Sequence, residues 1–154
     1  MAMEIERRFL VSGDGWRTAP GRVLKQGFIA VSRERVVRVR IDGDTAWLTI
    51  KAMVTHTSRH EFEYAIPMAD AQTMLDTLCP AVMEKLRRRV TVGSHVWEVD
   101  EFFGDNAGLV LAEVELAQED EAFVTPDWLG EEVTQDGRYT NAHLSQHPYG
   151  HWPA

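Results

Sequence analysis

Charged side chains recur at every second position inside segments that are otherwise apolar and strand-forming. The first such segment places Glu4, Glu6 and Arg8 on alternate positions, with Ile5 and Phe9 among the residues of the other parity. Successive side chains of a β-strand point to opposite faces, so one face of this strand is ionic and the other is largely apolar. A charged face is ordinarily the solvent face of an antiparallel sheet. The other segments decide whether that ordinary interpretation holds here.

The same alternation returns in further segments along the chain. Carboxylate pairs interrupt apolar residues at Glu61/Glu63 and Glu113/Glu115, and basic residues alternate with apolar ones around Arg38/Arg40. Further charged positions of this kind are Lys51, Lys85, Arg87, Glu98 and Asp100. The apolar faces of these strands must be buried, so the charged faces either stay open to water or close into a barrel with an ionic interior. Only closure would bring carboxylates and bases from distant strands together.

Length and composition narrow the class of protein. With 154 residues, 44% hydrophobic and 26% charged, the chain is expected to form one domain over residues 1–154. No apolar run reaches the length of a membrane span, and the N-terminus enters the charged strand directly, so we expect a cytoplasmic protein without membrane association. A net charge of −8 argues against a nucleic-acid partner. The clustered bases of residues 33–40 and 85–89 instead favour a small anionic ligand held inside.

Short alternating runs bounded by turn signals predict a mainly β protein of the α+β class. The expected strands are Glu4–Val11, Arg22–Val31, Arg35–Ile41, Thr45–Lys51, Ser58–Ile66, Met83–Val92, His95–Phe102 and Val110–Gln118. A helix is expected over Ala69–Leu78, and a second short helix after Tyr139. Arg88 falls off the Lys85/Arg87 face of its strand and is therefore expected in solvent.

The mixture of acids and bases indicates a specific ligand chemistry. Mg²⁺ and Mn²⁺ take carboxylate oxygens, whereas Arg and Lys match phosphate oxygens. A charged interior without partners would carry large desolvation and like-charge costs. The combination therefore fits a metal-bound polyphosphate.

The segment Glu4-Ile5-Glu6-Arg7-Arg8 closely resembles the ExExK signature of the CYTH, or triphosphate tunnel metalloenzyme, superfamily. Agreement continues through Arg38-Val39-Arg40, Leu48-Thr49-Ile50-Lys51, Glu61-Phe62-Glu63, Glu84-Lys85-Leu86-Arg87, Val99-Asp100 and Glu113-Val114-Glu115. The C-terminal residues from Trp128 to Asn141 look like the ending of the short bacterial members, which are inorganic triphosphatase-like. The resemblance implies an eight-stranded antiparallel closed β-barrel whose interior is a tunnel, with a few covering helices, and a ligand that carries a triphosphate group.

Roles for individual residues follow from the resemblance by position. The metal ligands for Mg²⁺ or Mn²⁺ would be Glu4, Glu6, Asp100, Glu113 and Glu115. The phosphate-binding residues would be Arg8, Arg38, Arg40, Lys51, Lys85 and Arg87. The attacking water would be oriented by Glu61 or Glu63, with Arg8 neutralising developing charge. The expected reaction is metal-dependent hydrolysis of a small-molecule triphosphate, with inorganic tripolyphosphate giving pyrophosphate and phosphate.

Two departures from the family pattern keep other functions open. Arg8 replaces the usual Lys of the signature, and Phe28 replaces a Tyr that often follows a Gln-Gly pair on the second strand. Arginine stays protonated, so Arg8 can orient an oxygen but cannot act as a general base. The alternatives are a class IV-type adenylate cyclase, for which no adenine pocket is marked, and a polyphosphate- or nucleotide-binding module without chemistry. The pattern also leaves a homodimer open.

Overall fold

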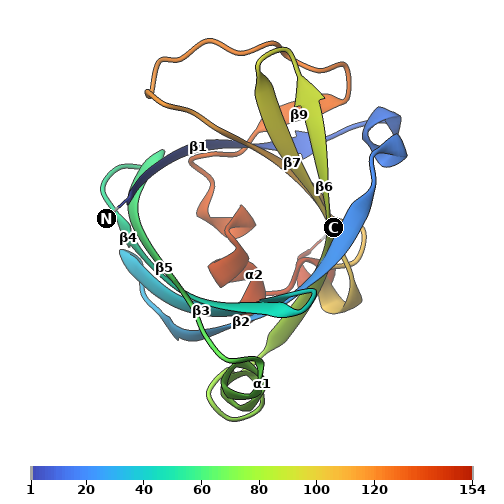
Figure 1. Cartoon of the computed structure of the whole chain (residues 1–154). Helices are drawn as coiled ribbons and strands as arrows, with labels where there is room; N and C mark the ends of the chain where they lie inside the picture. The colour runs from blue at the N-terminus through green and yellow to red at the C-terminus, as the bar shows by residue number, and fades with distance from the viewer. Residues whose placement is uncertain (1, 154) are drawn as a thin grey trace.

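The computed structural model describes residues 2–153 and consists of one antiparallel sheet closed on itself (Figure 1). The strand order is β5-β4-β3-β2-β6-β7-β8-β1-β9, and β1 also pairs with β5, so the first eight strands form a barrel. The strands are β1 (Ala2–Val11), β2 (Gly21–Val31), β3 (Arg35–Asp42), β4 (Thr45–Met53), β5 (Ser58–Ala65), β6 (Val82–Val92), β7 (His95–Phe102), β8 (Val110–Glu115) and β9 (Leu129–Glu132). The helices are α1 (Met68–Thr77) and α2 (Asn141–Gln146), with short 3-10 turns at Gly15–Thr18, Gly104–Asn106, Gly137–Tyr139 and Tyr149–His151.

The predicted closed eight-stranded barrel is confirmed, and so are both expected helices. The strand His95–Phe102 has the predicted bounds, whereas β8 ends at Glu115 and not at Gln118. β9 was missed because its four residues are too short and too acidic to show an alternating pattern. No helix among residues 2–153 combines the length and apolar character that crossing a bilayer requires.

Closure of the barrel depends on β1, which uses different neighbours along one edge. Its first half, Ala2–Ile5, pairs with β5, while Phe9 and Val11 pair with β9. The opposite edge pairs with β8 over Glu6–Leu10. β9 therefore occupies the part of the β1 edge that β5 leaves free, and this added strand protects backbone groups that would otherwise be unpaired.

The inner face of the barrel changes from ionic to apolar along the strands. Lys85 and Asp100 share their strand faces with Met83 and Phe102, two residues away on β6 and β7. Met83 and Phe102 belong to an apolar cluster that includes Leu144 of α2, which is fully buried. In Figure 1, α2 lies inside the ring of strands. The C-terminal segment thus fills the apolar part of the interior, and the ionic part stays available for a ligand.

The outer faces of the strands are covered by helix and loop, as the alternating pattern requires. Helix α1 packs Ala71 and Leu75 against Val39 and Ala46 of β3 and β4. A second outer cluster covers β1, β7 and β8 and contains Phe9, Trp16, Trp97, Val99, Ala112, Val114, Leu116 and Trp128. These clusters hold the strands in place, so that the ionic inner face can be maintained.

Gly27 of β2 lies in close contact with the segment that follows α1. A Cβ atom at this position would lie 2.8 Å from the Cβ atom of Cys79 and 3.1 Å from the carbonyl oxygen of Ala81. Cys79 itself is half-buried. Because the close neighbours include backbone as well as a short side chain, this contact cannot relax at low cost.

We expect Gly27→Ala to lower the free energy of unfolding by about 1–3 kcal/mol, the usual cost of overpacking. Chemical denaturation followed by tryptophan fluorescence measures the change. Gly137→Ala is the matched control, because no heavy atom lies within 4 Å of a Cβ atom at that position. Equal unfolding midpoints for the two variants would contradict the packing argument.

Candidate active site

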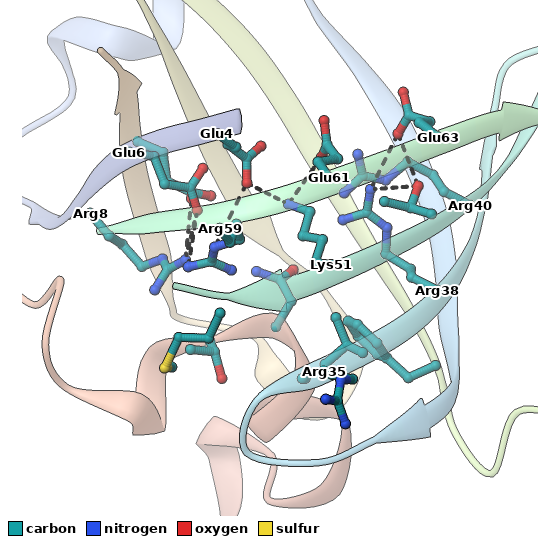
Figure 2. A pocket seen from close by; sticks show the side chains of 18 of the residues that line it. Glu4, Glu6, Arg8, Arg35, Arg38, Arg40, Lys51, Arg59, Glu61 and Glu63 are labelled. Atoms are coloured by element: carbon teal, nitrogen blue, oxygen red, sulfur yellow. Dashed lines mark hydrogen bonds and ion pairs between the residues drawn. The ribbon is translucent and has the colours of Figure 1, made fainter. Parts of the chain in front are cut away.

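The ionic part of the interior encloses a cavity of about 310 Å³. Its acidic side is made by Glu4 and Glu6 of β1 and by Glu61 and Glu63 of β5, which form a row in Figure 2. The bases that line it are Arg8 on β1, Arg38 and Arg40 on β3, Lys51 on β4, Arg59 on β5, Lys85 and Arg87 on β6, and Arg33 and Arg35 around the start of β3. Acids and bases from distant parts of the chain therefore face one cavity, as closure predicts.

Lys51 and Arg59 connect the acidic residues of β1 and β5. The Lys51 Nζ atom lies 3.0 Å from Glu4 Oε1 and 3.4 Å from Glu61 Oε2. Arg59 lies 3.8 Å from Glu4 and 3.7 Å from Glu6. Two carboxylates thus converge on the position of one cationic nitrogen, at the seam where β1 meets β5 (Figure 2).

Arg8 lies between two carboxylates on neighbouring strands. Its Nη2 atom is 3.2 Å from Glu6 Oε1 and 3.3 Å from Glu113 Oε2. Burial and the carboxylates of Glu113 and Glu4 raise the pKa of Glu6. Burial alone would also raise the pKa of Glu113, but the Arg8 guanidinium holds it well below its usual range. Arg8 therefore stabilises a charged carboxylate at Glu113 and is itself fixed in the cavity wall.

Arg38 is held by β4 and β5. Its Nη2 atom donates to Thr49 Oγ1 at 3.3 Å and lies 3.7 Å from Glu63 Oε2, and the Thr49 hydroxyl donates to the same Glu63 oxygen at 2.9 Å. Figure 2 shows Arg38 and Arg40 pointing toward Glu63. The Glu63 carboxylate is consequently oriented by a hydroxyl and a guanidinium together.

Asp100 holds two cations from β6. It accepts hydrogen bonds from Arg87 at 2.8 and 2.9 Å and lies 2.7 Å from Lys85 Nζ. Asp100 and Lys85 are each only 1% exposed. Burial alone would raise the pKa of Asp100, but Lys85 and Arg87 hold it well below its usual range. Both Asp100 oxygens are therefore engaged by bases, which fits a residue that positions Lys85 and Arg87.

Most of the residues predicted from the sequence meet at this cavity. Eleven of the thirteen line it directly, namely Glu4, Glu6, Arg8, Arg38, Arg40, Lys51, Glu61, Glu63, Lys85, Arg87 and Glu113. Asp100 and Glu115 are outside the lining set. Most of Glu115 is exposed to solvent. The partial burial of its carboxylate, together with the nearby carboxylates of Glu4 and Glu61, raises its pKa.

Several cavity residues were missed by the sequence analysis. Arg59 shares the inner face of β5 with Glu61 and Glu63, so the alternating pattern could have found it. Asn141 had no such signal, because it belongs to the C-terminal segment that folds back into the barrel. The expectation that Arg88 is in solvent was wrong, since its side chain is 14% exposed and bonds Glu101 at 3.1 Å.

The oxygen donors of the acidic side fit a hard divalent cation. Among residues 2–153, no three acidic, His or Cys side chains form a ready-made metal cluster. Mg²⁺ is usually held by only one or two carboxylates together with substrate phosphates and water. Glu4 and Glu6 of β1 and Glu113 of β8 line the same cavity and can supply carboxylates of that number. The residues present therefore suit a metal that arrives with its phosphate ligand.

A closed antiparallel barrel with facing acids and bases inside it defines a class of anion-binding tunnel. The chain belongs to the CYTH domain family, which matches residues 2–146. The resemblance predicted from the sequence is thereby confirmed.

Named relatives match the chain over nearly its whole length. The inorganic triphosphatase of Acetivibrio thermocellus is 46% identical over 151 residues, covering 97% of this chain and 97% of the relative. The inorganic triphosphatase of Nitrosomonas europaea is 35% identical over 150 residues, covering 92% and 96%. A crystal structure of an inorganic triphosphatase has a TM-score of 0.68 and 32% identity, covering 94% of this chain and 95% of that one.

We expect Asp100→Asn to destabilise the fold by about 3–5 kcal/mol, because it leaves Lys85 and Arg87 buried without their counter-charge. Thermal or urea unfolding measures the loss. Asp42→Asn is the matched control, since Asp42 pairs with the exposed Arg22 at 2.8 Å and such pairs contribute at most about 1 kcal/mol. A smaller loss at Asp100 than at Asp42 would refute the positioning role.

Proposed function

We propose that this chain hydrolyses small inorganic triphosphates, with tripolyphosphate as the main substrate, in a reaction that depends on Mg²⁺ or Mn²⁺. The observation that carries the proposal is one cavity lined by nine bases and by a row of carboxylates. Phosphate oxygens match the bases, and the carboxylates suit the cation that accompanies a polyphosphate. The names of the two relatives, both inorganic triphosphatases, support the same reaction.

The substrate is held by bases from β3, β4 and β6. Arg38 and Arg40 line the cavity from β3, Lys85 and Arg87 from β6, and Lys51 from β4. Guanidinium groups bind phosphate oxygens bidentately, which fixes the orientation of the chain of phosphates. Positioning of this kind, with electrostatic stabilisation, supplies most of the catalysis in phosphoryl transfer.

The metal would be held by Glu4, Glu6 and Glu113, with Glu115 as a predicted ligand near them. When bound, such a cation neutralises charge on phosphate oxygens as a Lewis acid. Asp100, the fifth predicted ligand, is proposed instead to keep Lys85 and Arg87 in place, because its oxygens already accept from both.

The attacking water would be oriented by Glu61 or Glu63. The water oxygen bonds to the terminal phosphorus, and the bridging P–O bond breaks with its electron pair on the leaving pyrophosphate oxygen. One water proton stays on the orthophosphate and the other ends on pyrophosphate or in solvent. Arg8 stays protonated and offsets the charge that develops on the phosphate oxygens. Phe28 lines the same cavity and supplies no hydroxyl, so the water depends on the carboxylates of β5.

Release of orthophosphate from tripolyphosphate tests the proposal, with ATP in parallel and with Mg²⁺, Mn²⁺ or chelator. We expect rapid release from tripolyphosphate, slower release from ATP, and no release when chelator removes the metal. Cyclic AMP formed from ATP would identify a cyclase instead. Tight binding of tripolyphosphate without release under any of these metals would identify a binding module.

Glu4→Gln and Glu6→Gln should each lower the rate of phosphate release by at least about 100-fold, since loss of a metal ligand exceeds the usual effect of an outer-shell change. Circular dichroism should show an unchanged fold. Glu84→Gln is the control, because Glu84 is exposed on β6 and does not line the cavity. Turnover retained by either cavity variant would count against the assigned ligands.

A further inference from the structure

A chain of hydrogen bonds joins two of the phosphate-facing bases through uncharged amides. Lys85 Nζ donates to Asn141 Oδ1 at 2.8 Å, and Gln26 Nε2 donates to the same oxygen at 2.9 Å. Arg40 Nε donates to Gln26 Oε1 at 2.9 Å. The chain thus runs from β6 through the first residue of α2 to β2 and β3, across the interior of the barrel.

The direction of every bond in this chain is fixed by the two bases. Burial lowers the pKa of Lys85 to about 7, and the Asp100 carboxylate 2.7 Å away opposes that fall and favours the charged form. A charged Lys85 and the Arg40 guanidinium have no acceptor atoms, so both can only donate. The oxygen of Asn141 must therefore face Lys85, and the oxygen of Gln26 must face Arg40. The remaining Gln26 nitrogen then donates to Asn141. This leaves Asn141 Nδ2 without a hydrogen-bond partner among residues 2–153, on a residue that lines the cavity.

Asp100 is the carboxylate beside Lys85, and the use of amides adds no second negative charge there and none at Arg40. Arg40 has no carboxylate within ion-pair distance among the described residues, and Gln26, which holds it, is fully buried. Burial and the neighbouring Arg38 and Arg87 lower the pKa of Arg40 to about 9, so the side chain carries its charge at neutral pH. A carboxylate in place of either amide would hold the bases equally well but would compete with the bound anion.

We propose that Gln26 and Asn141 are positioning residues that aim Arg40 and Lys85 at the substrate while keeping the cavity wall cationic. The inference rests on the proposed function and adds that affinity for the triphosphate depends on the neutrality of this amide pair. The free Asn141 Nδ2 group adds one donor for a phosphate oxygen.

Asn141→Asp tests the inference, because it retains the acceptor oxygen for Lys85 and Gln26 and changes only Nδ2 into a charged oxygen. We expect the dissociation constant for tripolyphosphate to rise by about tenfold or more, since a full charge is added beside the anion. Calorimetric titration with tripolyphosphate measures binding, and chelator prevents turnover during the titration. Phosphate release with metal present then gives KM and kcat separately. The melting temperature should not fall, because the new charge lies beside Lys85.

Asn141→Leu provides the contrasting variant. It removes the acceptor from Lys85 and from Gln26, so both affinity and melting temperature should fall. The matched control is Asn106→Asp, a buried amide outside the cavity whose oxygen accepts from the Tyr149 backbone N–H at 2.8 Å. This control should bind tripolyphosphate as the natural protein does.

The outcomes separate this inference from the proposed function. Weaker binding by Asn141→Asp with an undiminished melting temperature supports the inference. Unchanged affinity overturns it, and so does a loss of affinity accompanied by destabilisation as large as that of Asn141→Leu, since Asn141 would then serve the fold alone. If the natural protein neither binds nor hydrolyses tripolyphosphate, the proposed function fails first.

Discussion

The pairing of β1 with β5 is the contact on which the rest of the structure depends. Among residues 2–153, the sheet is closed by the short ladder from Ala2↔Glu61 to Ile5↔Ser58. Without it, Glu4 and Glu6 would lie on an exposed sheet face, and Lys51 would have no carboxylate from β1 beside it. On an open sheet these charged side chains would face water. Closure places them around one cavity, where acids and bases must form hydrogen bonds and ion pairs with one another. The site is therefore a property of topology as much as of side chains.

The balance of charge inside the barrel differs from strand to strand. On β1, β4 and β5 each base lies against carboxylates, as with Lys51 between Glu4 and Glu61. The inward-facing bases of β3 and β6 are Arg38, Arg40, Lys85 and Arg87. The carboxylates beside them are the buried Asp100 and the more exposed Glu63 and Glu98. Arg40 and Lys85 also donate to neutral amides. The interior is thus divided into an acidic side and a cationic side. A polyphosphate with its metal has the complementary arrangement of charge, so one ligand can compensate both sides at once.

The alternating pattern predicted the strands and their charged faces but left an open sheet and a closed barrel as alternatives, and the family resemblance was needed to predict closure. The pattern could not assign a role to Asp100. An acidic residue two positions from Glu98 gives the same sequence pattern whether its carboxylate faces a ligand or pairs with a base. The register Arg87↔Asp100 decides that question, and register depends on pairing across the sheet. Asn141 was beyond prediction for a related reason, because nothing in a local pattern shows that a C-terminal segment enters the barrel.

The apolar end of the interior explains why that segment enters. Met83, Phe102 and Leu111 continue the strand faces that carry Lys85, Asp100 and Glu113, and an open barrel would leave them against water. Burial of Leu144 among them provides the hydrophobic free energy that holds α2 inside. The same packing places Asn141, the first residue of α2, at the boundary between the apolar and the ionic halves. Packing at the apolar end of the barrel therefore sets the position of the amide that orients Lys85 at this boundary.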